Sequence, residues 1–280
     1  LFVGIMIICA NAGGAWSPIG DVTTTMLWIK GQISAPAVIT KVFVPSLVCM
    51  LVPLIYYQFK LPKQAISQQD ERNTDANPDG KKMLILGVSI LLLVPVFKTV
   101  THLPPYMGIL LGLGVVWVFS EIIHSNKDDE RRRPLSVAHA LSRIDTASIL
   151  FFLGILLAVG ALEATHILGS FADFLNQTVG NLDIIAMIIG ASSSVVDNVP
   201  LLAATQNMYS LSEFPMDSKL WLLLAYTTGT GGSILIIGSA AGVAAMGMED
   251  ISFTWYLRRI STLALLGFLA GVIAFLALNS

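Results

Sequence analysis

Long apolar stretches alternate with short polar segments along this 280-residue chain. Several of the apolar stretches approach the roughly 20 residues that an α-helix needs to cross a lipid bilayer. We therefore expect an all-α polytopic membrane protein. Continuous spans are predicted over residues 36–58, 83–101, 105–123, 147–165 and 255–278. The mixed apolar and polar pattern of residues 167–178 is typical of an amphipathic helix at the membrane interface.

Two further apolar stretches contain the same glycine-rich interruption. The first reads Gly13-Gly14, four residues, then Ile19-Gly20-Asp21, and the second reads Gly231-Gly232, four residues, then Ile237-Gly238-Ser239. Irregular backbone at membrane depth leaves amides and carbonyls unpaired, so it must be buried in protein or line a polar cavity. Paired interruptions of this kind indicate the binding site of a transporter. We predict broken helices over 1–29 and 219–247, with the first break at Asn11–Gly20.

A third interrupted stretch, residues 182–209, predicts a re-entrant hairpin, because each of its two arms is too short to span a bilayer. Its centre contains Ser192-Ser193-Ser194 and Asp197-Asn198-Val199-Pro200. Counting the predicted crossings gives the two broken helices opposite directions through the membrane. This arrangement is typical of an inverted-repeat transporter with discontinuous helices.

The predicted organisation has three segments. Residues 1–58 form the end of a first repeat (broken helix plus span), and residues 59–82 form a polar linker. Residues 83–280 form a second repeat with scaffold spans, the hairpin, the second broken helix and the last span. Basic residues gather in the linker, in the loop 124–144 and at Arg258-Arg259. All three lie on one side in this topology, and the positive-inside rule makes that side cytoplasmic.

The composition narrows the possible functions. The chain is 55% hydrophobic and 12% charged, with a formal net charge of −2. This balance gives no argument for nucleic-acid binding. Its two cysteines, Cys9 and Cys49, both lie in apolar stretches, where a free cysteine usually behaves as a small buried hydrophobe. We therefore expect no disulfide framework, no zinc site and no bound cofactor.

Asp21 follows the first break, and an ionisable group at membrane depth is costly to keep and is by default a functional candidate. Thr24 and Thr25 come three and four residues later, on the same face of a helix. Asn11 lies on the other side of the break. Carboxylate, amide, hydroxyl and carbonyl oxygens together suit a hard cation such as Na⁺ or Li⁺. Alternatively, Asp21 caps the second half-helix and binds no ion.

Asp197 and Asn198 form a second constellation with Ser193 and Ser194, again either as ligands or as a helix cap. A proton and a cation compete for one carboxylate, because a nearby cation favours its ionised form. This competition would couple the two fluxes. The second break offers hydroxyls where the first offers a carboxylate. The candidate ion-binding residues are Asn11, Asp21, Thr23, Thr24, Ser193, Ser194, Asp197, Asn198, Thr230 and Ser233, with Asp21 and Asp197 as ligands of the transported Na⁺.

The stretches Asn11–Thr25, Ser193–Pro200, Ser142–Thr146 and Gly229–Ser233 resemble those of NhaD-type sodium/proton antiporters of the ion transporter superfamily. The resemblance covers essentially the whole chain. It implies exchange of Na⁺ or Li⁺ for H⁺ by alternating access, in a bacterial inner membrane or a chloroplast envelope. It also implies a homodimer of two-repeat subunits. The family pattern has a first hairpin before the first broken helix, so we expect this chain to be the later part of a longer protein.

Three other functions are weighed against the antiporter. A sodium-coupled carboxylate or oxyanion carrier of the same superfamily is disfavoured because Asp197 would repel an anion. A non-transporting partial chain is consistent with the missing first hairpin. An intramembrane aspartyl protease is disfavoured because Val196 precedes Asp197 where that class has a tyrosine. We therefore expect a secondary transporter and not an enzyme, with Na⁺, H⁺ and the lipid bilayer as its partners.

Overall fold

The computed structural model describes residues 2–60, 78–125, 136–142, 144, 146–249 and 251–279. Every regular element in these ranges is a helix, so the all-α prediction is confirmed for the described part of the chain. The helices are α1 (Phe2–Ala15), α2 (Val22–Ile29), α3 (Ala35–Lys60), α4 (Pro78–Thr101), α5 (Pro105–His124), α7 (Val137–Leu141), α8 (Thr146–Ala164), α9 (Ile167–Thr178), α10 (Leu182–Ser192), α11 (Asn198–Met208), α12 (Lys219–Gly231), the 3-10 helix η2 (Ile236–Gly238), α13 (Ala240–Met248), α14 (Phe253–Arg259) and α15 (Ser261–Leu278).

The chain forms two compact units. Unit 1 comprises Leu1–Pro62 and Leu153–Ser280, and unit 2 comprises Lys63–Phe152. All the candidate ion-binding residues lie in unit 1. Unit 2 contains residues 83–152 of the predicted second repeat, and the predicted three-segment organisation stays a prediction. The predicted linker 59–82 and the basic loop 124–144 lie largely outside the described residues, so their placement stays a prediction.

Both predicted broken helices are interrupted, but later along the chain than the glycine pairs alone suggested. The first helix continues through Asn11 and both glycines to Ala15, and the irregular backbone covers residues 16–21. The predicted break at Asn11–Gly20 was therefore placed about one helical turn too early. In the second element, α12 ends at Gly231, and α13 begins at Ala240 after η2.

The two broken helices run antiparallel. Just before α12, Asp217 donates its amide to the Gln32 carbonyl at 2.9 Å and accepts the Ser34 amide on its carboxylate at 2.6 Å, which places the start of α12 beside the end of α2. At the opposite end, Ile7 and Ile8 of α1 share a buried cluster with Ala245 of α13. The start of each element therefore lies beside the end of the other.

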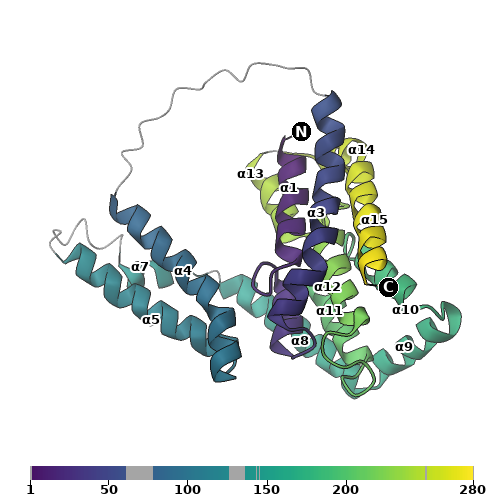
Figure 1. Cartoon of the computed structure of the whole chain (residues 1–280), viewed down its shortest axis with the longest axis horizontal. Coiled ribbons are helices and arrows are strands. Elements are labelled where there is room, and N and C mark those ends of the chain that lie inside the picture. The colour runs from purple at the N-terminus through teal and green to yellow at the C-terminus, as the bar shows by residue number, and fades with distance from the viewer. Residues whose placement is uncertain are drawn as a thin grey trace. The chain divides into compact units, whose positions relative to one another are not determined.

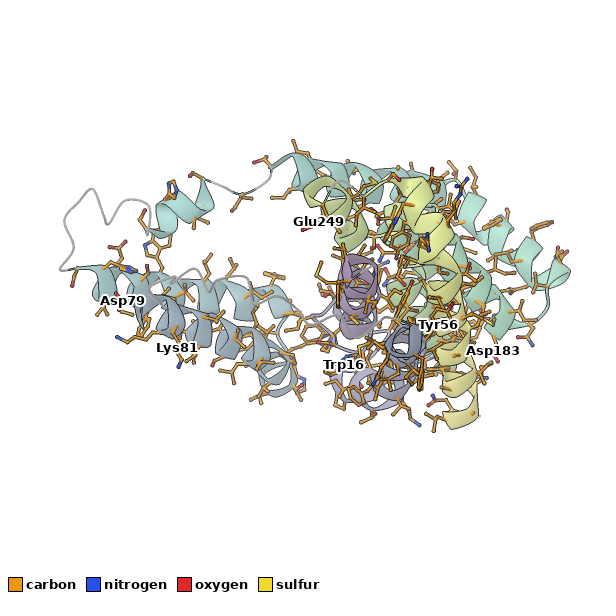
Figure 2. All side chains as sticks on the ribbon, turned by 90° about the horizontal axis from the view of Figure 1, so that it is seen from above. Trp16, Tyr56, Asp79, Lys81, Asp183 and Glu249 are labelled. Carbon is orange, nitrogen blue, oxygen red and sulfur yellow. The ribbon has the colours of Figure 1, made fainter. Side chains whose placement is uncertain are left out.

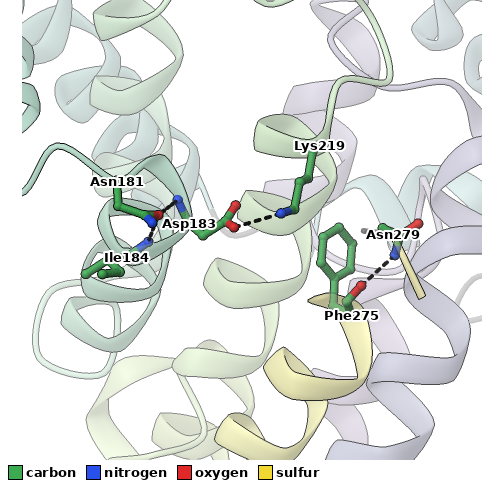
Figure 3. Close-up of polar contacts among 6 residues, drawn as sticks. All are labelled: Asn181, Asp183, Ile184, Lys219, Phe275 and Asn279. Atoms are coloured by element: carbon green, nitrogen blue, oxygen red, sulfur yellow. Dashed lines mark hydrogen bonds and ion pairs between the residues drawn. The ribbon is translucent and has the colours of Figure 1, made fainter. Parts of the chain in front are cut away.

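Helix α10 begins, and helix α11 ends, beside the start of α12. Figure 3 shows the ion pair between Lys219 Nζ and Asp183 Oδ2 (2.7 Å), which joins the first turns of α12 and α10. At the end of α11, Gln206 Nε2 donates to Gln32 Oε1 at 2.8 Å, and Gln32 in turn accepts the Asp217 amide. The chain therefore turns back between these two helices, at residues 193–197.

Long helices support these short ones. In unit 1, α3 and α15 pack side by side, with α12 against both (Figure 1). Tyr226 of α12 is fully buried and donates its hydroxyl to the Phe268 carbonyl at 2.8 Å. The predicted continuous span 255–278 was wrong in one respect. It is interrupted at Ile260, which is buried between α14 and α15 against Gly4 of α1.

Unit 2 contains two of the predicted spans as the apolar helices α4 and α5, which pack against each other. Gly108 and Gly112 of α5 lie against Phe97 and Ile90 of α4, where a Cβ would come within 2.8 and 2.1 Å of those side chains. Charged residues gather at the first turn of α4, where Figure 2 labels Asp79 and Lys81. Among the described residues, four helices are long and apolar enough to cross a membrane, at 35–59, 79–101, 105–124 and 261–278.

The tight packing of α10 on α12 gives a first prediction. A Cβ on Gly231 would lie 1.9 Å from the Gly190 carbonyl oxygen, so Gly231→Ala must push backbone apart, and overpacking of this kind costs about 1–3 kcal/mol. We expect a lower thermal unfolding midpoint in detergent. The matched control is Gly247→Ala on α13, where a Cβ meets open space. Equal midpoints for the two variants would contradict the packing described here.

Candidate functional site

Close backbone contacts bring the three interruptions of unit 1 together. A Cβ on Gly229 of α12 would lie 2.8 Å from the Cβ of Ala15, at the first break. A Cβ on Gly238, in the second break, would lie 2.6 Å from the Cα of Ser194 in the α10–α11 turn. Gly231 lies against Gly190 and Ser193. The candidate site is therefore a junction where residues 16–21, 193–197 and 232–239 meet.

Asp21 lies at this junction and caps α2. Its Oδ1 accepts the Val22 amide at 2.8 Å, and its Oδ2 accepts the Thr23 hydroxyl. Asn198 Nδ2, from the α10–α11 turn, lies 3.5 Å from the same Oδ2. The Asp21 side chain is half-buried. The carboxylate that the sequence singled out is thus both a helix cap and a contact to the third interruption.

The three threonines after Asp21 donate hydrogen bonds either to its carboxylate or to its backbone carbonyl. Thr23 donates to the carboxylate, whereas Thr24 and Thr25 donate to the Asp21 backbone carbonyl at 3.0 and 2.8 Å. Thr24 and Thr25 therefore lie on the same turn as Asp21, but their hydroxyls bond its backbone carbonyl and not its carboxylate. Threonine in a helix often bonds the carbonyl one turn back, and Asp21 supplies that carbonyl.

The α10–α11 turn presents Asp197 and Asn198. Asp197 caps α11 by accepting the Val199 amide at 3.1 Å and is half-buried, while Asn198 is buried. Ser193 and Ser194 donate their hydroxyls to the Gly190 and Ala191 carbonyls at 2.6 and 2.7 Å. Each hydroxyl oxygen keeps lone pairs with which it can still act as an acceptor or a cation ligand.

The second break meets α1 through a buried hydrogen bond. Asn11 Nδ2 donates to Ser239 Oγ at 3.0 Å, and Ser239 caps α13 by accepting the Gly242 amide at 3.2 Å. Ser239 is not among the residues predicted for the site, although the internal repeat aligns it with Asp21. Thr230 and Ser233 are buried and donate to the carbonyls of Tyr226 and Thr230.

The chemistry of the junction is that of oxygen ligands. The residues at the three interruptions include two carboxylates and several hydroxyls, a set that suits small hard cations. Among the described residues, no group of three or more His, Cys, Asp or Glu side chains comes together. The arrangement can hold a monovalent cation or a proton on the same carboxylate oxygens.

Apolar helices that can cross a membrane, joined to interrupted helices that meet at a polar junction, define an integral membrane transporter. Comparison with known sequences agrees with this class. The sequence profile of the citrate transporter family matches residues 1–229, and the chain belongs to this family. No solved structure matches the chain.

Three similar proteins are named as antiporters, not as enzymes. Sodium/proton antiporter 1 of Arabidopsis thaliana is 50% identical, and the alignment covers 100% of this chain and 49% of that protein. Sodium/proton antiporter 2 of the same plant is 47% identical over 100% of this chain and 67% of that protein. The Na⁺/H⁺ antiporter NhaD of Vibrio cholerae is 32% identical over 98% of this chain and 61% of that protein. The chain thus spans about half to two thirds of these relatives.

The contact between α1 and the second break gives a second prediction. In a double-mutant cycle, Asn11→Ala and Ser239→Ala should show a coupling of about 0.5–1.5 kcal/mol in the free energy of unfolding, because each removes the same buried hydrogen bond. The measurement is denaturant unfolding in detergent. As a control, Ser239→Ala is paired with Ser170→Ala on the exposed face of α9, for which we expect additivity. Additivity of the Asn11 pair would mean that Asn11 of α1 and Ser239 of the second break do not interact.

Proposed function

We propose that this chain carries the ion-binding half of a secondary antiporter that exchanges Na⁺ or Li⁺ for H⁺. The observation that carries the proposal is the position of Asp21, a carboxylate held by Val22, Thr23 and Asn198 where three interruptions meet. The names of the antiporter relatives agree with it. The membrane would be a bacterial inner membrane or a chloroplast envelope, as the sequence resemblance implied.

The fold that we propose for this activity is an inverted repeat. Helices α1–α3 and α12–α15 correspond at a constant separation of 218 positions, which relates Gly13 to Gly231, Ala35 to Phe253 and Lys60 to Leu278. Contacts across the proposed axis are reciprocal, as two-fold symmetry requires. Asn11 bonds Ser239, and its equivalent, Gly229, lies against Asp21, the equivalent of Ser239.

The proposed axis passes between α3 and α15. Cys49 and Gly267 are equivalent positions, and a Cβ on Gly267 would lie 2.4 Å from the Cys49 carbonyl oxygen. A position that touches its own symmetry mate must lie at the axis. Together with the antiparallel course of the two broken helices, this contact supports the inverted repeat. In this arrangement α10 and α11 would form a re-entrant hairpin whose turn meets the breaks near the middle of the membrane.

Competition at the carboxylates would couple the two ions. Ionised Asp21 and Asp197 attract a cation, and protonation removes that attraction. Movement of the hairpin and broken helices between two accessible states would then release the cation on one side and the proton on the other.

The sequence resemblance also implies a homodimer, which cysteine crosslinking in native membranes would test.

A carboxylate or oxyanion carrier is a second candidate, favoured by the name of the citrate transporter family whose profile matches the chain. Asp21 and Asp197 at the junction would repel such a substrate unless a cation intervened. Uptake of labelled citrate into proteoliposomes separates the two candidates, because it should be absent under conditions in which Na⁺ drives proton movement. Both assays are run on this chain and on the complete gene product. If this chain is a non-transporting part of the transporter, only the complete gene product will be active.

Charge removal gives a third prediction. Asp21→Asn and Asp197→Asn should each lower Na⁺-driven proton movement by at least about tenfold, equivalent to about 1.4 kcal/mol, since the amide cannot ionise. The measurement is a pH-sensitive dye in proteoliposomes, with membrane insertion checked by labelling. The control is Asp173→Asn on α9, which removes an exposed carboxylate away from the junction. Wild-type exchange in both junction variants would refute the site.

Competition also gives a fourth prediction, on pH dependence. If one proton and one Na⁺ compete for the same carboxylate, the half-saturating Na⁺ concentration rises as pH falls. In the acidic limit it rises about tenfold per pH unit, as linkage requires for one displaced proton. The measurement is the initial exchange rate against Na⁺ concentration at several pH values. A half-saturating concentration that does not change with pH would show that Na⁺ and H⁺ use separate groups.

A further inference from the structure

Tyr256 reaches the second break from outside the broken helices. It lies on α14 and is fully buried, and its hydroxyl donates to the Ser233 backbone carbonyl at 2.7 Å. Ser233 lies two residues beyond the end of α12, in the irregular segment, where the helix no longer supplies an amide partner one turn ahead. The tyrosine hydroxyl therefore satisfies a carbonyl that the interruption has freed. This contact was not predicted from the sequence.

The ring of Tyr256 is fixed by its surroundings. It packs in a buried cluster with Ile7 and Ile8 of α1, Ile236 of η2 and Ile260 at the start of α15. Ile236 lies three residues beyond the carbonyl that Tyr256 caps and is itself fully buried. The aromatic ring and its hydroxyl thus hold both sides of the turn that leads from Ser233 into η2.

The proposed repeat has no such hydroxyl at the first break. The position equivalent to Tyr256 is Val38 of α3, at the separation of 218 residues, and valine has no hydrogen-bond donor. The first break instead carries the charged cap Asp21. The two breaks are therefore stabilised differently, one by a carboxylate within the junction and the other by a hydroxyl from the surrounding helices.

We infer that Tyr256 is a positioning residue for the ion site, which keeps the second break unwound and so sets the placement of Ser233, Gly238 and Ser239 against the α10–α11 turn. Gly238 lies against Ser194, and Ser239 bonds Asn11, so a shift of this break moves two partners of the junction. The expected effect of Tyr256 on transport rests on the proposed antiport activity. The expected effect of Tyr256 on the backbone of the second break does not.

The test compares two tyrosines of the same cluster. Tyr256→Phe removes the hydroxyl and keeps the ring. Tyr57→Phe is the matched control, because Tyr57 lies in the same cluster but donates to the Arg259 carbonyl at 2.8 Å, away from the break. The first readout is hydrogen–deuterium exchange of the amides of residues 232–239 in the complete gene product. We expect these amides to exchange about tenfold faster in Tyr256→Phe, equivalent to about 1.4 kcal/mol. In Tyr57→Phe we expect their exchange rates to be unchanged.

The second readout is Na⁺-driven proton movement. We expect Tyr256→Phe to raise the half-saturating Na⁺ concentration about tenfold and to leave the maximal rate within about twofold, because the ligands remain and their placement changes. Incorporation of 3-fluorotyrosine at position 256 keeps the donor and should restore both readouts.

The outcomes separate the two proposals. Unchanged amide exchange in Tyr256→Phe, or the same change in Tyr57→Phe, overturns the positioning role. Faster exchange at the break without an altered Na⁺ dependence overturns the link to the ion site. A wild-type protein that moves no protons in response to Na⁺ refutes the antiport, and the amide exchange then still decides whether Tyr256 holds the break.

Discussion

The arrangement of unit 1 depends on one constraint, which is the cost of leaving backbone amides and carbonyls unpaired away from water. Three interruptions create such groups, and each is resolved by a side chain. Asp21 accepts an amide of α2, Asp197 accepts one of α11, and Ser239 accepts one of α13. Glycine at the ends of the helices lets the three irregular segments approach closely enough to share these polar groups.

The same constraint explains why an ion site would form here. A cap must be a strong acceptor, and the strongest acceptor, a carboxylate, also attracts cations and protons. Capping and ion binding are therefore compatible readings of Asp21, because its two oxygens have different partners. Oδ1 holds the Val22 amide, whereas Oδ2 faces the side chains of Thr23 and Asn198.

Local sequence signals predicted the elements well and their contacts poorly. The paired glycines and short apolar arms correctly indicated two broken helices and a turn between α10 and α11, because backbone interruption has a local signature. They placed the first break too early, because the glycine pair does not end the helix, which continues through Gly13 and Gly14 to Ala15. The bond from Asn11 to Ser239 and the reach of Tyr256 to Ser233 join residues far apart in sequence, so no local pattern could predict them.

The contact between Asp21 and Asn198 shows how the junction would exchange one ligand for another within the proposed mechanism. At 3.5 Å the amide of Asn198 lies beyond the usual range of a good N–H···O bond, so little energy is lost when it moves. A cation at Oδ2 would need an oxygen from the α10–α11 turn where the amide nitrogen now points, and rotation of the Asn198 amide supplies one. Oδ1 would keep its bond to Val22 throughout. The cap would then hold the helix while the other oxygen changes partners, which couples ion occupancy to the position of the turn without breaking α2.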